Sequence, residues 1–86
     1  MGQKQYSTAR LRWAIAQLEE VEEEIRGMES LWGGSPLLVN PAQYEHDWVQ
    51  FANAARARSH YAHLLERRRE LRERIRRLSR QVEVGA

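Results

Sequence analysis

The apolar residues in the first third of the chain recur at alternating intervals of three and four without interruption. They are Leu11, Ala14, Leu18, Val21, Ile25, Met28 and Trp32. This spacing places all of them on one face of an α-helix, at the a and d positions of a heptad. It predicts a helix over about residues 8–31, with Ser7 or Thr8 as N-cap and Gly33 just beyond its end. Such a face has to pack against another helix.

A second helix is predicted after a short connection. Two glycines and a proline in residues 33–36 cannot continue a helix, which makes residues 32–40 a connection. Asn40, Pro41 and Gln43 then combine an N-cap, a first-turn proline and a capping-box partner, so the second helix should run over about residues 41–82. Its own heptad positions, with one arginine among them, are Ala54, Ala57, Tyr61, Leu64, Arg68, Leu71, Ile75, Leu78 and Val82.

The two helices predict a single all-α domain over residues 1–86, an antiparallel hairpin with a long C-terminal helix. A first helix of this length covers only the first part of the second, so the chain from about Arg67 onward should overhang. An apolar seam on an overhang requires another chain, which predicts a coiled-coil dimer or a helical bundle. The predicted interface residues are Leu64, Arg68, Leu71, Ile75, Leu78 and Val82.

Two further contacts follow from the expected register of the hairpin. The glutamates between Glu19 and Glu24 should approach Arg56 and Arg58, and Arg10 and Arg12 should approach Glu66 and Glu70. Apolar residues near the connection should close the loop end as an aromatic cluster. Its expected members are Trp32, Leu37, Leu38, Val39, Tyr44, Trp48 and Phe51.

Composition and motifs narrow the classes of function that the chain can have. Leu, Ile, Val and Phe make up 18 of 86 residues, so the core is thin and a second chain would add stability. The chain has no cysteine, no apolar run that could span a membrane and no N-terminal apolar stretch typical of a signal peptide, which favours a soluble cytoplasmic protein. His60 and His63 lack the further ligands that zinc requires, and no serine lies in a nucleophile motif. We therefore expect no enzyme, metal, cofactor, membrane or small-molecule substrate.

The net charge of +2 conceals a strongly basic segment, because residues 67–80 contain eight arginines and two glutamates. One interpretation is a solvated helix with pairs from Glu70 to Arg74 and from Glu73 to Arg77. A second is binding to nucleic-acid phosphates, and a third is binding to an acidic protein. The candidate residues for the second and third are Arg67, Arg69, Arg72, Arg74, Arg76, Arg77 and Arg80.

The sequence thus predicts a non-enzymatic helical interaction, adaptor or structural protein. Its partner would be a second copy or a larger protein assembly, bound through the C-terminal seam. The alternative is a small basic helical protein that binds nucleic acid through the same helix.

Trp32, Gly33 and Gly34 form a Trp-x-Gly sequence between the two predicted helices of a short, cysteine-free chain. In these three residues and in the hairpin layout, the chain resembles the small helical hairpins exported by type VII secretion. The resemblance implies a secreted WxG-like hairpin as a further alternative. The family's Tyr-x-x-x-Asp/Glu export signal is not matched, since Trp48 follows Tyr44 and Leu65 follows Tyr61 at that spacing.

Overall fold

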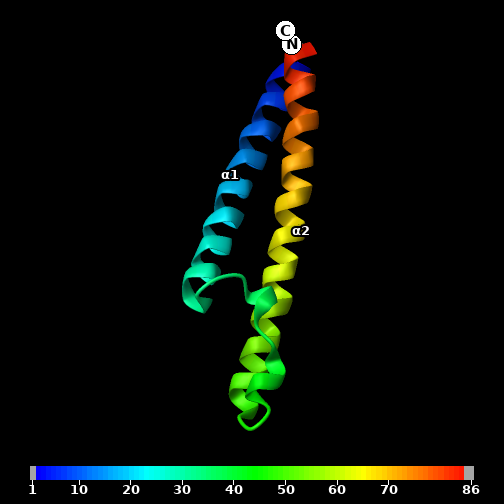
Figure 1. The fold of residues 1–86 in the computed structure, drawn as a ribbon. Helices are drawn as coiled ribbons and strands as arrows, with labels where there is room; N and C mark the ends of the chain where they lie inside the picture. Colours follow the sequence, from blue (N-terminus) through cyan, green and yellow to red (C-terminus); the bar gives the residue numbers. More distant parts are fainter. Residues whose placement is uncertain (1, 85–86) are drawn as a thin grey trace.

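The computed structural model describes the backbone of residues 2–84 and the side chains of residues 8–83. Two long helices run antiparallel, so that the start of the first and the end of the second lie at the same end of the molecule (Figure 1). No strand occurs in this part of the chain. The predicted all-α hairpin with a long C-terminal helix is confirmed. The elements in chain order are α1 (Gly2–Trp32), two short 3-10 helices η1 (Pro36–Leu38) and η2 (Pro41–Tyr44), and α2 (Trp48–Val84).

Helix α1 ends at the predicted glycine pair. Gly33 has φ of +70° and Gly34 has φ of +144°, a region that side chains with a Cβ rarely adopt. The amide of Gly34 donates a hydrogen bond of 2.8 Å to the carbonyl of Glu29, five residues earlier. This is the six-to-one bond of a Schellman motif, which satisfies a carbonyl left open at the end of the helix. The Trp-Gly-Gly sequence therefore acts here as a helix stop.

The start of the second helix differs from the prediction. The side chain of Asn40 does act as a cap and accepts a hydrogen bond of 3.1 Å from the amide of Ala42. The helix that it caps is only η2, however, which ends at Tyr44. Asp47 caps α2 instead, because its Oδ1 accepts from the amides of Val49 at 3.1 Å and Gln50 at 3.2 Å. The connection is accordingly longer than expected, over residues 33–47, and α2 begins at Trp48.

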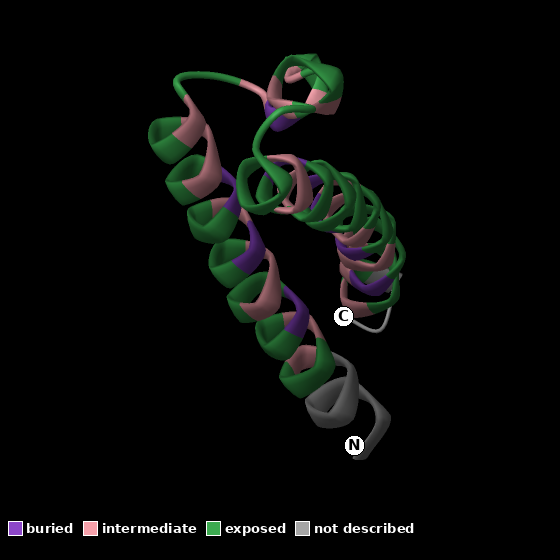
Figure 2. Cartoon of the chain, turned by 90° about the horizontal axis from the view of Figure 1, so that it is seen from below, coloured by how far each residue is buried: buried purple, intermediate pink, exposed green. Residues whose placement is uncertain are grey.

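The core lies between the two helices. In Figure 2 the buried residues of α1 and α2 face one another, and the outer faces are exposed. The central cluster joins Val21 and Ile25 of α1 to Tyr61, Leu64 and Leu71 of α2, with Leu18, Met28 and Leu65 packed against it. The heptad spacing identified this face correctly, since the buried apolar side chains of the two helices within residues 8–83 are Ala14, Val21, Ile25, Ala54, Tyr61, Leu64, Leu71 and Leu78.

The overhang lies at the opposite end from the predicted one. Helix α1 runs beside the C-terminal part of α2, and the first turns of α2 extend past the end of α1 with the connection beside them (Figure 1). Leu71 and Leu78 are only 1% and 4% exposed, so the expectation of an unpaired segment from Arg67 onward is wrong. Two changes in the element bounds explain the shift: α1 begins at Gly2, and the connection extends to residue 47.

Candidate functional site

The arginines of the C-terminal half of α2 pair mainly along their own helix. Arg67 Nη1 lies 3.8 Å from Glu70 Oε2. Arg69 bonds to Glu66 on one side and to Glu73 on the other, with 3.0 Å from its Nη1 to Glu73 Oε1. These exposed pairs at i, i+3 and i, i+4 spacing favour the helix and neutralise part of its charge.

Two of these partners differ from the expected ones. Glu70 pairs with Arg67 rather than with Arg74, and Glu73 pairs with Arg69 rather than with Arg77. The consequence is that Arg74 and Arg77 are not held by the glutamates of their own helix.

The contact between Arg69 and Glu66 also affects proton binding. The hydrogen bonds that the Arg69 guanidinium donates lower the pKa of Glu66 below the ordinary value for glutamate. The same hydrogen bonds raise the pKa of Arg69, with a further contribution from the charge of Glu73. Each of the three guanidinium nitrogens of Arg69 donates a hydrogen bond to one of these two glutamates.

Two arginines of this segment reach α1. Arg72 Nη2 lies 3.3 Å from Glu22 Oε1, in an ion pair that links the two helices. The Arg74 guanidinium lies over the ring of Trp13, 5.8 Å from its centroid, at a distance typical of a cation–π contact. Trp13 remains 49% exposed, so this contact lies at the surface.

The contact of Trp13 sets the register near the chain ends. Because the helices are antiparallel and Trp13 contacts Arg74, Arg10 and Arg12 lie beside the part of α2 that follows Arg74. The predicted approach of these two residues to Glu66 and Glu70 is therefore wrong.

The acidic residues of α1 also find other partners than predicted. Glu24 Oε1 lies 3.2 Å from His60 Nε2, and Glu22 reaches Arg72. The predicted partners were Arg56 and Arg58, which lie closer to the start of α2.

This register separates the charges of the hairpin. Residues 2–15 contain three basic residues and no acid, and residues 67–84 contain eight arginines against three glutamates, for a net charge of +8. These two segments share one end of the molecule (Figure 1). Residues 16–66 contain nine acids against three arginines, for a net charge of −6. One end of the rod is thus strongly basic, although the chain as a whole is nearly neutral.

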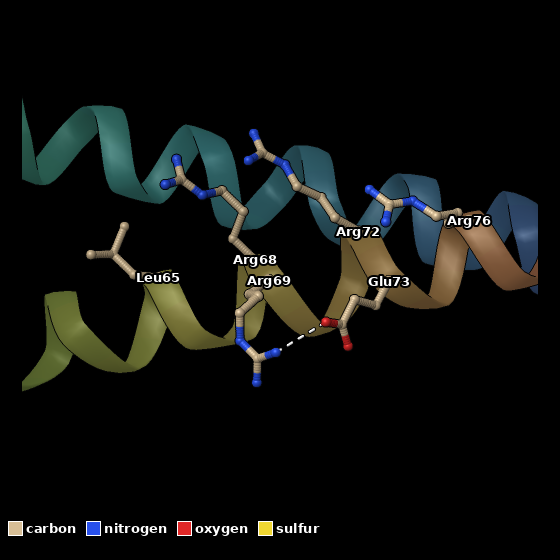
Figure 3. A pocket seen from close by; sticks show the side chains of 6 residues that line it. All are labelled: Leu65, Arg68, Arg69, Arg72, Glu73 and Arg76. Atoms are coloured by element: carbon tan, nitrogen blue, oxygen red, sulfur yellow. Dashed lines mark hydrogen bonds and ion pairs between the residues drawn. The ribbon is translucent and has the colours of Figure 1, made fainter.

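A hollow of about 420 Å³, open to solvent, runs along α2 within the basic half. Figure 3 shows Arg68, Arg72 and Arg76 side by side, extending toward α1, whereas the Arg69 to Glu73 pair points away from α1. Arg67, Arg74, Arg77 and Arg80 are not among the lining residues. We call this hollow the arginine groove; its lining residues are Leu65, Arg68, Arg69, Arg72, Glu73 and Arg76.

Four arginines of residues 67–80 form neither an ion pair with a carboxylate nor a cation–π contact with a ring of residues 8–83. They are Arg68, Arg76, Arg77 and Arg80. Two of them, Arg68 and Arg76, line the arginine groove. Their guanidinium groups are available to bind an anion.

The predicted seam is part of the hairpin core. Among its six residues, Leu64, Leu71 and Leu78 are buried, and Arg68, Ile75 and Val82 are half-buried. The premise that these residues lack a partner within the chain is wrong, because α1 covers them. Arg68, which sequence reasoning assigned to the seam alone, lies at its edge and lines the arginine groove.

The loop end exposes apolar side chains that the sequence predicted to be covered. Leu38 is 85% exposed and Trp48 is 77% exposed, so the expected closed aromatic cluster does not form around them. Among residues 8–83, the one ring stack that corresponds to the cluster is that of Trp48 on Phe51, with ring centroids 5.9 Å apart. The connection lies beside one side of α2 and leaves these side chains in solvent. Together with two neighbours that were not predicted to belong to the cluster, Leu31 and Val49, they are the most exposed large apolar side chains of residues 8–83. We call Leu31, Leu38, Trp48 and Val49 the loop-end residues.

Metal-ligand clusters and membrane-spanning segments can be assessed for the described residues. Within residues 8–83, no three side chains of His, Asp or Glu are grouped so that they could hold a metal ion. Neither described helix has a segment that is long and apolar enough to cross a bilayer.

Comparison with protein-family models, with curated proteins and with solved structures gives no match to this chain. The features of the molecule that bear on its function are therefore the two surfaces described above, the arginine groove and the loop-end residues.

Proposed function

We propose that this protein is a non-enzymatic helical interaction protein that pairs with a second copy of itself through its loop end. The observation that carries the proposal is the exposure of the loop-end residues, which ranges from 65% for Val49 to 85% for Leu38. These side chains come from the end of α1, from η1 and from the start of α2, and exposed large apolar side chains gathered toward one end of a small protein mark an interaction surface. The seam predicted from the sequence cannot serve in this way while the hairpin is closed, because its leucines are buried.

The charge distribution favours a second copy joined at this end. The basic ends of two hairpins, each with a net charge of +8, repel one another. The loop ends carry few charges, since residues 30–55 contain only Glu45 and Asp47. An arrangement in which the loop ends meet therefore keeps the basic ends far apart, and a twofold axis brings the same residues of each copy together.

The available area suits a small interface. At the exposed fractions above, one tryptophan and three aliphatic side chains present about 250–450 Å² of apolar surface per chain. Two copies would then bury about 500–900 Å² of apolar area, and apolar atoms make up about 60% of an interface. The total buried area, with the polar atoms included, therefore reaches the lower part of the range of about 1,200–2,000 Å² for stable interfaces. We expect a dimer that dissociates on dilution.

The test is the solution mass by multi-angle light scattering over a hundredfold range of protein concentration, at high salt. We expect the mass to rise from that of one chain toward that of two. The double variant Leu38→Ser with Val49→Ser should remain a monomer throughout. Ile15→Ser, which changes a 41% exposed side chain away from the loop end, is the matched control and should dimerise as the natural sequence does.

Two results would refute the proposal. One is a natural protein that stays a monomer at every concentration. The other is a dimer that persists in the Leu38→Ser, Val49→Ser variant, which would move the interface to another face of the hairpin.

A further inference from the structure

The arginine groove is a second surface, and it does not depend on the loop end. We propose that it binds the phosphate backbone of a nucleic-acid strand. The ligand class follows from the side chains that line the groove, from their spacing and from the charge of this end of the molecule.

The spacing of the arginines suits a chain of regularly placed anions. Arg68, Arg72 and Arg76 are four residues apart, so neighbouring members lie about 6 Å apart along α2. All three extend to the same side of the helix (Figure 3). The row is about 12 Å long, and a nucleic-acid strand places one phosphate about every 3.4 Å of axis, so three or four phosphates lie within its reach.

The guanidinium groups of Arg68, Arg72 and Arg76 can bind phosphates without breaking a strong contact within the protein. Arg68 and Arg76 form no ion pair with the described carboxylates. Arg72 has one contact to Glu22 at 3.3 Å, with its side chain 56% exposed, and an exposed pair of this kind is weak. A planar guanidinium forms two parallel hydrogen bonds to a phosphate, which strengthens each contact. Arg69 contributes charge alone, because its side chain points away from α1 and pairs with Glu66 and Glu73 (Figure 3).

The surrounding charge adds attraction over a longer range. The groove lies in the half of the hairpin with a net charge of +8, and the other half carries −6. A polyanion is therefore drawn to the basic end and repelled by the other. An acidic protein would respond to the same field, but its carboxylates have no fixed spacing along the chain. The regular row of arginines therefore favours nucleic acid.

The measurement is the fluorescence anisotropy of a labelled oligonucleotide of mixed sequence, as a single strand and as a duplex, at increasing salt concentration. With about three phosphate contacts, the logarithm of the binding constant should fall with the logarithm of salt at a slope of about −2 for the single strand and about −3 for the duplex. The comparison of the two also reports which form binds more tightly.

The decisive variant is Arg68→Gln with Arg76→Gln, which removes the two unpaired arginines from the groove. We expect binding to weaken about tenfold or more, and the salt slope to lose about two contacts. The matched control, Arg56→Gln with Arg58→Gln, removes the same charge from exposed positions near the start of α2. The control should bind within about threefold of the natural protein. Circular dichroism checks that both variants are folded.

Several outcomes would overturn the proposal. One is the absence of binding to either oligonucleotide at low salt. Another is an equal loss in the two double variants, which would reduce the effect to net charge. A third is tighter binding to a labelled polyglutamate peptide than to either oligonucleotide, which would assign the groove to an acidic protein.

Discussion

Replacement of Leu71 by alanine tests whether the C-terminal seam belongs to the folded monomer. Leu71 is 1% exposed and packs in the cluster with Val21, Ile25, Tyr61 and Leu64. Comparable Leu→Ala changes in protein cores cost about 2.7–5 kcal/mol, and the cost is smaller where neighbours can relax into the cavity. A pair of helices packed on one face only can relax in this way. We therefore expect a loss of about 2–3 kcal/mol in the free energy of unfolding.

The assay is urea unfolding followed by far-ultraviolet circular dichroism at two protein concentrations. The loss should be the same at both, because α1 is the partner of Leu71 within one chain. Leu38→Ala, measured at the lower concentration where the protein is a monomer, is the matched control: it deletes the same atoms from a side chain that is 85% exposed, and should change stability by less than about 0.5 kcal/mol. If Leu71→Ala does not fold, Ile25→Val at a 2% exposed position gives a smaller step of about 0.5–1.5 kcal/mol.

The reasoning fails if Leu71→Ala and Leu38→Ala cost the same small amount. It also fails if the cost of Leu71→Ala appears only at the concentration where the protein is associated. That second result would return Leu71 to an interface between chains.

Three further predictions concern the helix ends and one side-chain pair. Gly33→Ala should lower the free energy of unfolding by about 1 kcal/mol, because φ is +70° at this position. Gly27→Ala, within α1, should raise the free energy of unfolding by about 0.4–1 kcal/mol, because nothing lies within 4 Å of the added Cβ. Thermal unfolding of the two variants and the natural protein measures both changes. Asp47→Ala should cost about 0.5–2 kcal/mol and should increase amide hydrogen exchange in the first turn of α2, since two amides lose their acceptor. The carboxyl of Glu66 should titrate below the ordinary glutamate range by NMR, and Arg69→Gln should raise its pKa; its contribution to stability is present above the pKa of unfolded glutamate and is lost as pH falls through the lowered value.

The pairing of the helices could be predicted from the sequence because it depends on a repeated pattern. Val21, Ile25, Leu64 and Leu71 all lie on the predicted faces and are buried. The register of α1 against α2 could not be predicted, because it depends on the residue at which the short connection between them ends. Asn40 has every local property of a helix start, but Asp47, a few residues later, accepts hydrogen bonds from two amides and is the cap of α2. The resulting shift in the start of α2 helps to move the overhang from one end of the hairpin to the other.

The contacts of the candidate site could likewise be predicted only in part, because they also depend on the register of the two helices. A count of charges identified the basic segment of α2, including Arg72 and Arg76, but the sequence does not say which arginines have partners. Arg74 meets Trp13 and Arg72 meets Glu22 only because of the register. The heptad position of Arg68 predicts a place in the apolar seam and gives no sign that this residue also borders the groove. The exposure of Trp48 was missed for a related reason, because the path of the connection determines what it covers.

The elongated shape of the hairpin affects how its size appears in solution. The molecule measures 62 × 17 × 15 Å, with a radius of gyration of 18.0 Å. A globular chain of this length has a radius of gyration of about 12 Å, and a value of 18 Å is typical of a globular protein of about 250 residues. A single hairpin will therefore leave a sizing column ahead of globular proteins of equal mass, at a volume that imitates an oligomer.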